Sequence, residues 1–268
     1  MIKTIHIIGA IILYLSVNGY AQQMDQMPCE MENAAFLEGE ELVYKVYYNW
    51  QFIWIPAGEV RFNLKETEDT YEVEVKGSSY PSYDGFFQVN DYYASSIDKE
   101  TMQPTKFIRD VEQGKYLRYD SIVFNRDDYV IKEYLGKYQH STKEYNFEFQ
   151  DCIQDMVSVF YLLRNYEDSN IEKGLTLPIN VFFDKEFYNL DVKVLDKGKR
   201  RIKGLGKQDV IHISPQIVSG EVFKEGDEMN IWVSDNESKI PLMIESAVTV
   251  GSVKAVLISH SNTKDQIF

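Results

Sequence analysis

The chain has 268 residues, with 42 acidic and 28 basic side chains and a formal net charge of -14 at neutral pH. This excess of acids argues against nucleic acid or an anionic membrane as the main partner, and it favours solubility. After removal of a leader, the remaining length is sufficient for one large β domain or two small ones.

The first 21 residues have the pattern of a secretory signal peptide. Lys3 precedes an apolar run over residues 5–17, and Gly19 and Ala21 supply small residues before a cleavage point. A membrane anchor needs about 20 continuous apolar residues, and Asn18 cuts this run short. We therefore expect cleavage after Ala21, export to the periplasm and no transmembrane anchor in the mature chain.

Residues 22–37 lack periodicity and predict an N-terminal arm. A β-rich domain is expected over residues 38–262, either as one unit or as two β halves on either side of a helix and linker at 151–174. Its strands alternate apolar and polar residues and are separated by turn residues, as in antiparallel hairpins. The expected strands are 41–50, 58–66, 70–79, 86–98, 105–113, 116–125, 128–136, 141–149, 175–184, 188–196, 199–207, 209–217, 229–235, 242–250 and 252–260.

One segment, residues 151–165, has the helical period. Its apolar residues recur at i, i+3, i+4 and i+7, and they are Ile153, Met156, Val157, Phe160 and Leu163. Asp151 and Gln154 have the spacing of a capping box. The polar residues form only a narrow stripe, so we expect a buried central helix. The fold class is therefore mostly β, with an antiparallel curved sheet or incomplete β-barrel, a meander, around this helix.

Two cysteines, Cys29 and Cys152, remain in the mature chain. An even number of cysteines in an exported protein favours a disulfide, which here would tie the arm to the start of the helix. The closed loop of about 123 residues would stabilise the fold by roughly 4 to 5 kcal/mol in the chain-entropy model. Two separate buried thiols are the alternative.

The sequence contains no recognisable catalytic or cofactor motif. The mature chain has no GxSxG, CxxC or phosphate-binding loop, and its histidines show no HxxxH or HxH spacing. Acidic residues near Asp235 and Glu237 are too few in series for a calcium loop. We therefore expect a non-enzymatic protein without catalytic residues, metal or cofactor.

An aromatic cluster lies between the first two expected strands. Trp50, Phe52 and Trp54 occupy what should be a surface connection, where polar residues are usual. Exposed apolar clusters of this size mark contact sites. We expect these three side chains to contact a ligand or a partner.

A second unusual segment is basic, with six cations in residues 197–207 of an otherwise acidic chain. Lys199, Arg200, Arg201 and Lys203 are the candidate anion patch, suited to a lipid headgroup or another phosphate. The alternative is an edge strand whose charges discourage aggregation between sheets.

Four stretches together carry a family resemblance. They are GEELVYKVYYNWQFIWIPAGEVRF, DYYASSID, the helical DMVSVFYLLR and the terminal NIWVSDNESKIPLMIESAVTVGSVKAVL. As a set they resemble the exported bacterial family known as domain of unknown function 3108 (DUF3108), over roughly residues 36 to 260. The resemblance implies a periplasmic β-rich protein, and AQQ after the cleavage site is similar to Bacteroides-type exported proteins. It implies no activity, cofactor or catalytic residue.

The expected function follows from this fold class. A curved sheet with a buried helix is similar to the incomplete barrels of periplasmic lipoprotein carriers, so we expect binding of a hydrophobic or lipid-like ligand in a curved β groove. The alternative is an interaction or scaffold protein of the cell envelope that uses the aromatic tip against another protein. No nucleic acid partner is expected.

Overall fold

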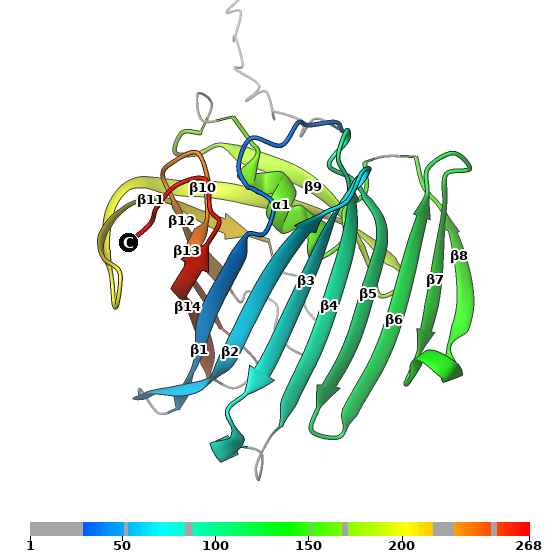
Figure 1. Ribbon diagram of the computed structural model, residues 1–268, viewed down its shortest axis with the longest axis horizontal. Helices are drawn as coiled ribbons and strands as arrows, with labels where there is room; N and C mark the ends of the chain where they lie inside the picture. Colours follow the sequence, from blue (N-terminus) through cyan, green and yellow to red (C-terminus); the bar gives the residue numbers. More distant parts are fainter. Residues whose placement is uncertain are drawn as a thin grey trace, which may run out of the picture.

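The computed structural model of the chain describes residues 29–50, 53–83, 88–150, 152–167, 171–216, 228–247 and 251–268 (Figure 1). The expected signal peptide, residues 1–21, and the first part of the expected arm lie outside the described residues. Within the described ranges, no helix has the length and apolar character needed to cross a membrane.

Fourteen strands form one open sheet in which every neighbouring pair is antiparallel. The first eight strands are β1 (Glu41–Trp50), β2 (Ile53–Glu66), β3 (Thr70–Ser79), β4 (Val89–Asp98), β5 (Pro104–Gln113), β6 (Tyr116–Asn125), β7 (Val130–Gly136) and β8 (Lys143–Glu148). The others are β9 (Thr176–Phe183), β10 (Glu186–Ile202), β11 (Gly206–Pro215), β12 (Met229–Ser234), β13 (Pro241–Ala247) and β14 (Ser252–Ser261).

The order across the sheet is β8 to β1 and then β14 to β9. Strands adjacent in the chain are therefore adjacent in the sheet, except for β8 and β9, while β1 pairs with β14 and joins the two halves of the chain. The strands β8 and β9 are the two ends of the sheet, which curves around the single α-helix of the described chain (Figure 1). The expected mostly-β fold, with an antiparallel meander and one central helix, is confirmed.

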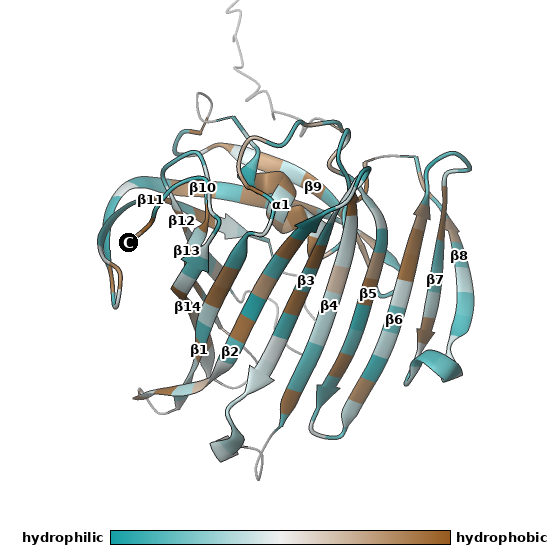
Figure 2. Cartoon of the chain, in the orientation of Figure 1, coloured by the Kyte–Doolittle hydropathy of each residue, from teal (hydrophilic) through white to brown (hydrophobic). Residues whose placement is uncertain are grey.

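The sheet has one apolar face because its strands alternate. In β3, Val73 and Val75 are buried, while the intervening Glu74 lies on the other face with Glu72 and Lys76. The resulting bands of hydrophobic and hydrophilic residues are visible along the strands (Figure 2). Successive side chains point to opposite faces of a strand, so this pattern directs one face towards the helix.

The helix α1 (Ser158–Arg164) has seven residues and is shorter than the expected 151–165. Gln154 is not a capping residue, because its backbone pairs with β9: its N–H donates to the Asn180 carbonyl, and its carbonyl accepts from the Phe182 N–H, both at 2.9 Å. Asp155 caps the helix instead, since its Oδ1 accepts from the N–H groups of Val157 (2.7 Å) and Ser158 (2.8 Å). The expected capping box is wrong, and Asp151 lies outside the described residues.

The polar stripe of this segment is buried as well. Asp155 Oδ2 accepts from the Ser95 hydroxyl at 2.6 Å, and Asn165 Oδ1 accepts from the Ala34 N–H at 2.6 Å. In contrast, Met156 is 45% exposed, although it belongs to the periodic apolar set. The helix segment is thus enclosed on its polar side too, because partners on β4 and the N-terminal arm satisfy its polar groups.

The strand β10 corrects another expectation, since the expected strands 188–196 and 199–207 are largely one strand of 17 residues. Its pairing with β11 shifts register between Val194 and Asp196 and then continues through Gly198. The chain reverses after Ile202 instead, where Gly204 and Gly206 have φ values of 92° and 77°. Only glycine adopts this left-handed backbone without steric cost.

Candidate functional site

A row of apolar side chains crosses the helix-bearing face of five neighbouring strands. The register pairs each member with the next one across β11, β12, β13, β14 and β1, and the row is Ile213, Ile231, Ile244, Ala255 and Val46. All five are only half-buried. Ile213 and Ala255 pack against core clusters that include side chains of α1, which places the row on the inner side of the sheet. This row, the apolar belt, leaves hydrophobic area incompletely covered.

The same face carries charged groups on the other half of the sheet. Arg109 on β5 lies directly opposite Asp120 on β6, with Nη2 and Oδ2 3.0 Å apart. Glu133 on β7 lies opposite Ile122, two residues along from Asp120. Asp120 and Glu133 are fully buried and Arg109 is 6% exposed. We call these three residues the buried charge cluster.

Glu133 and Asp120 face each other as two carboxyl groups. Burial, and secondarily the neighbouring Asp120 carboxyl, raise the pKa of Glu133 to about 8. Burial also raises the pKa of Asp120, although Arg109 and Arg118 oppose this rise. Neither Glu133 oxygen has a donor among the described residues. A proton retained on Glu133 at neutral pH allows it to donate to Asp120, so that like charges do not meet.

The turn between β9 and β10 lies over this charged region. Asp184, at the tip, forms an ion pair with Arg118 of β6. The ring centroids of Phe182 and Phe187 lie 5.1 and 6.4 Å from that of Phe147 on β8. The two ends of the open sheet are therefore joined through side chains, without a strand-to-strand hydrogen-bond ladder.

The expected aromatic connection is mostly a strand. Because Ile53, Trp54 and Ile55 are strong strand formers, β2 begins at Ile53 and only residues 51–52 connect it to β1. Phe52 lies outside the described residues, and the side chain of Trp50 is not described either. Trp54 is half-buried, while Ile53 beside it is 65% exposed.

The Trp54 ring lies on the face opposite the apolar belt. The ammonium of Lys254 is 4.1 Å from the ring centroid of Trp54 and 3.3 Å from Glu245 Oε2. Lys254 precedes Ala255 of the belt, and consecutive strand residues point to opposite faces. Trp54 is therefore placed for contacts outside the curved sheet.

The expected anion patch is exposed along β10 and the turn after it. Lys199 Nζ lies 3.0 Å from Asp209 Oδ2, and the Arg200 guanidinium lies 3.8 Å from the ring centroid of Trp232. Arg201 and Lys203 have no ion pair within the described chain. β9 pairs with β10 only as far as Lys193, so the part of β10 that carries these cations is an edge of the sheet on that side.

Cys29 and Cys152 form a disulfide, as expected. Cys29 and Cys152 have Cα atoms 5.3 Å apart, within the usual range for this bond. The bond links the N-terminal arm to the segment that leads into α1. Ala35 and Phe36 of the same arm are buried in the core, so the described part of the arm belongs to the packed structure.

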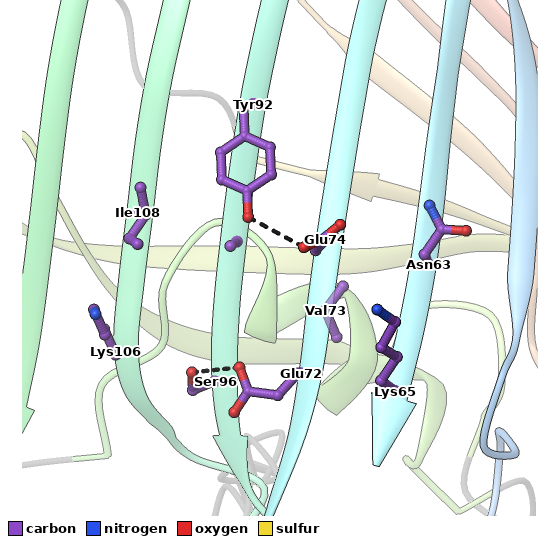
Figure 3. A pocket seen from close by; sticks show the side chains of 10 residues that line it. Asn63, Lys65, Glu72, Val73, Glu74, Tyr92, Ser96, Lys106 and Ile108 are labelled. Atoms are coloured by element: carbon purple, nitrogen blue, oxygen red, sulfur yellow. Dashed lines mark hydrogen bonds between the residues drawn. The ribbon is translucent and has the colours of Figure 1, made fainter. Parts of the chain in front are cut away.

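A depression of about 190 Å³ lies across β2 to β5 (Figure 3). Its acids already have local partners, since Glu72 accepts from the Ser96 hydroxyl at 2.7 Å and Glu74 accepts from the Tyr92 hydroxyl at 3.4 Å. No group of three or more His, Cys, Asp or Glu side chains within the described chain is arranged to hold a metal. We assign no binding role to this depression.

Sequence reasoning missed the buried charge cluster, although a signal was present. Arg109 is in phase with Phe107 and Val111, which are buried. Asp120 and Glu133 are likewise in phase with the buried apolar residues of their strands. A charged residue at one of the alternating positions that are otherwise apolar predicts a buried charge. Three successive strands with such a residue predict a cluster of buried charges.

Comparison with solved structures supports the fold. The chain is similar to a β-barrel-like protein of domain of unknown function DUF1849 from Brucella abortus, with a TM-score of 0.58 and 11% identity over 85% of this chain and 99% of that one. A protein described as exported, with a YmcC-like fold, from Bacteroides fragilis matches with a TM-score of 0.31 and 8% identity over 87% and 100% of the two chains. At 11% identity, the likeness to the Brucella protein concerns the fold alone.

Comparison with known sequences gives the family. No curated protein matches the chain. The model of the family described as "Protein of unknown function (DUF3108)" matches residues 43–258, which include α1, the apolar belt and the buried charge cluster. Since this match spans most of the sequence, the chain belongs to the DUF3108 family.

Proposed function

We propose that this protein is a non-enzymatic, periplasmic binding protein for an amphipathic, lipid-like ligand. The observation that carries the proposal is that the helix-bearing face combines the incompletely covered apolar belt with the buried charge cluster. The apolar belt crosses β11 to β1, whereas the charged residues lie on β4 to β7. The signal-like leader supports export.

The apolar belt favours a hydrophobic chain as one part of the ligand. Its side chains point to the core side of the sheet, yet each one remains half-buried. Full burial of a Val or Ile side chain contributes about 1.5 to 3 kcal/mol relative to exposure. A ligand chain that covers the belt would therefore gain a large part of its binding free energy there.

The buried charge cluster favours a polar group at the other end of the ligand. A single row of paired residues leads across the inner face from β2 to β6, and it consists of Val60, Gly77, Asp91, Val111 and Arg118. Neighbouring strands lie about 4.8 Å apart, so four spacings span about 19 Å along the sheet. This span suits an extended acyl chain with its polar end at the partly exposed Arg118.

Binding of a fluorescent fatty-acid analogue tests this function with a pair of double variants. Ile231→Thr/Ile244→Thr places hydroxyl groups in the belt and keeps β-branched side chains. Each buried hydroxyl without a partner costs about 1 to 3 kcal/mol, so we expect the Kd for the probe to rise about tenfold or more. The matched control, Ile108→Thr/Val123→Thr, changes the opposite face of the sheet and should bind as the wild type does. Equal Kd values for the two variants, or no saturable binding by the wild type, would contradict the proposal.

The exposed tip of the β1–β2 hairpin favours a second function, contact with another protein of the cell envelope. Ile53 is 65% exposed and Trp54 is half-buried beside it. Both lie at one end of the curved sheet, and Trp54 faces away from the apolar belt. A protein partner could therefore contact this tip without access to the inner face.

Trp54→Ser tests whether this tip belongs to the core. We expect a loss of about 0.5 to 1 kcal/mol, because the variant removes a cation–π contact with Lys254 at an accessible position. A buried Trp in the core would instead lose roughly 3 to 5 kcal/mol on truncation. Urea denaturation measures the difference, and the variant should still bind the fatty-acid analogue. A loss of roughly 3 to 5 kcal/mol would show that Trp54 belongs to the core and would contradict its proposed role in partner contact.

A further inference from the structure

Residues 197–207 form a two-stranded, basic extension of the sheet. The segment contains six cations and no acid, namely Lys197, Lys199, Arg200, Arg201, Lys203 and Lys207. β9 pairs with β10 only as far as Lys193, and β12 pairs with β11 only from Val210 onward. The distal part of the β10–β11 hairpin, the basic arm, therefore extends beyond both neighbours, and it is part of the yellow ribbon at the left of Figure 1.

Half of these cations have an identified partner. Lys197 Nζ lies 2.9 Å from Asp235 Oδ1, and Lys199 makes the exposed ion pair with Asp209. Arg200 stacks on Trp232. Within the part of the chain that the structure describes, Arg201, Lys203 and Lys207 form no ion pair. These three cations remain available to an external anion.

Two of the available cations face each other. The register places Arg201 directly opposite Lys207. Like charges at opposed positions of two strands destabilise the pairing, so this arrangement does not serve the stability of the arm. Edge protection alone does not require it either, because β8, at one end of the sheet, carries charges of both signs. An anion between the two side chains would relieve the repulsion.

The arm holds its cations on a fixed surface. Ile202 and Leu205, on either side of Lys203, are both buried. Gln208 Nε2 donates to the Leu205 carbonyl at 2.7 Å and closes the turn. Since the backbone of the turn is anchored, binding an anion requires little additional ordering of the chain.

We propose that the basic arm docks on the phosphate groups of an anionic lipid surface through Arg201, Lys203 and Lys207. Charge complementarity favours this partner, because mobile headgroups can place a phosphate between Arg201 and Lys207. The acidic remainder of the chain is repelled by the same surface, so only an orientation with the arm towards the lipid is favourable. The contact differs from the ligand site, and it would position the protein where lipid-like molecules are collected or delivered.

Co-sedimentation with lipid vesicles tests the docking surface. We expect the full chain to bind vesicles that contain phosphatidylglycerol, to bind phosphatidylcholine vesicles far more weakly, and to dissociate as salt is added. Arg201→Glu/Lys207→Glu retains a like-charged pair across the hairpin, so its effect on folding is balanced. Each basic residue near an anionic surface contributes roughly fivefold to the partition coefficient, and we expect this variant to lose about 20-fold or more.

The control variant, Lys115→Glu/Lys143→Glu, changes the net charge equally at two exposed positions, in the β5–β6 turn and on β8. It should retain most of the vesicle binding. Equal losses in the two double variants, or equal binding of the wild type to both vesicle types, would overturn the proposal. Displacement by millimolar inorganic phosphate would also overturn it, since it would indicate a site for the free anion. The arm variant should bind the fatty-acid analogue normally, which separates this result from the proposed ligand site.

Discussion

Replacement of Arg164 by alanine is expected to destabilise the protein by about 3 to 5 kcal/mol. Arg164 is 2% exposed and donates from both terminal nitrogens to Glu40, at 2.6 and 2.7 Å. Its Nε also donates to the Ser238 carbonyl at 2.8 Å. The guanidinium thus joins α1 to the start of β1 and to the turn between β12 and β13. Removing it leaves the Glu40 carboxylate buried without its main partner.

The pair formed by Arg61 and Glu41 provides the matched control. It has a similar distance, 2.8 Å, but its side chains are 45% and 35% exposed. Water replaces such a contact at little cost, so Arg61→Ala should lose less than about 1 kcal/mol. Urea denaturation of both variants measures the difference. Similar losses for Arg164→Ala and Arg61→Ala would show that the buried pair does not hold the helix in place.

Replacement of Glu133 by glutamine is expected to remove a component of the pH dependence of stability. The pKa of Glu133 is about 8 in the folded protein, whereas the ordinary value of 4.5 applies to the unfolded chain. Between these values the unfolded chain releases a proton that the folded protein retains, so rising pH favours unfolding. This contribution is complete below about pH 4.5 and is lost by about pH 8. A rise of this size corresponds to on the order of 5 kcal/mol.

Denaturant unfolding at several pH values between 5 and 9 measures this effect. The wild type should lose stability as the pH rises, and Glu133→Gln should lose distinctly less. Burial also raises the pKa of Asp155, to about 6, but that group is present in both proteins and its contribution cancels in the comparison. Glu148→Gln, at an exposed position on β8, should behave as the wild type does. Parallel curves for the wild type and Glu133→Gln would show that the buried pair does not titrate in this range.

The alternation of apolar and polar residues predicted most strands closely, because each strand is a local feature of the sequence. The strands 70–79 and 116–125 agree with the structure at both ends. The order of the strands could not be predicted in the same way. The β1–β14 pairing brings Leu42 opposite His260, and no local pattern encodes a contact over such a separation.

The helix shows where a local pattern was overridden by tertiary contacts. Ile153 and Val157 have the helical spacing and are both buried, as expected. However, the backbone at Gln154 makes hydrogen bonds with β9, and a residue in such a bridge cannot also begin a helix. The apolar period therefore predicted which side chains enter the core, but it did not predict where the helix begins.

The candidate site was only partly predictable, because alternation identifies two faces without saying which one is inside. The inward direction of Arg109, Asp120 and Glu133 follows only from the apolar residues at alternating positions of the same strands. Trp54 presented a further difficulty, since the β1–β2 pairing shifts register between Val46 and Tyr47. Such an irregularity interrupts the alternation along the hairpin. The face on which Trp54 lies therefore follows only from its contact with Lys254.

Native mass spectrometry of the protein purified under mild conditions from the cells that produce it tests whether the protein carries a lipid-like ligand. The proposed binding function predicts that part of the protein carries one additional amphipathic molecule, which organic solvent removes and a second spectrum identifies. The Ile231→Thr/Ile244→Thr variant should carry much less of it than the Ile108→Thr/Val123→Thr control. Protein that shows only its own mass, and that also fails to take up the fatty-acid analogue, would contradict the proposed binding function.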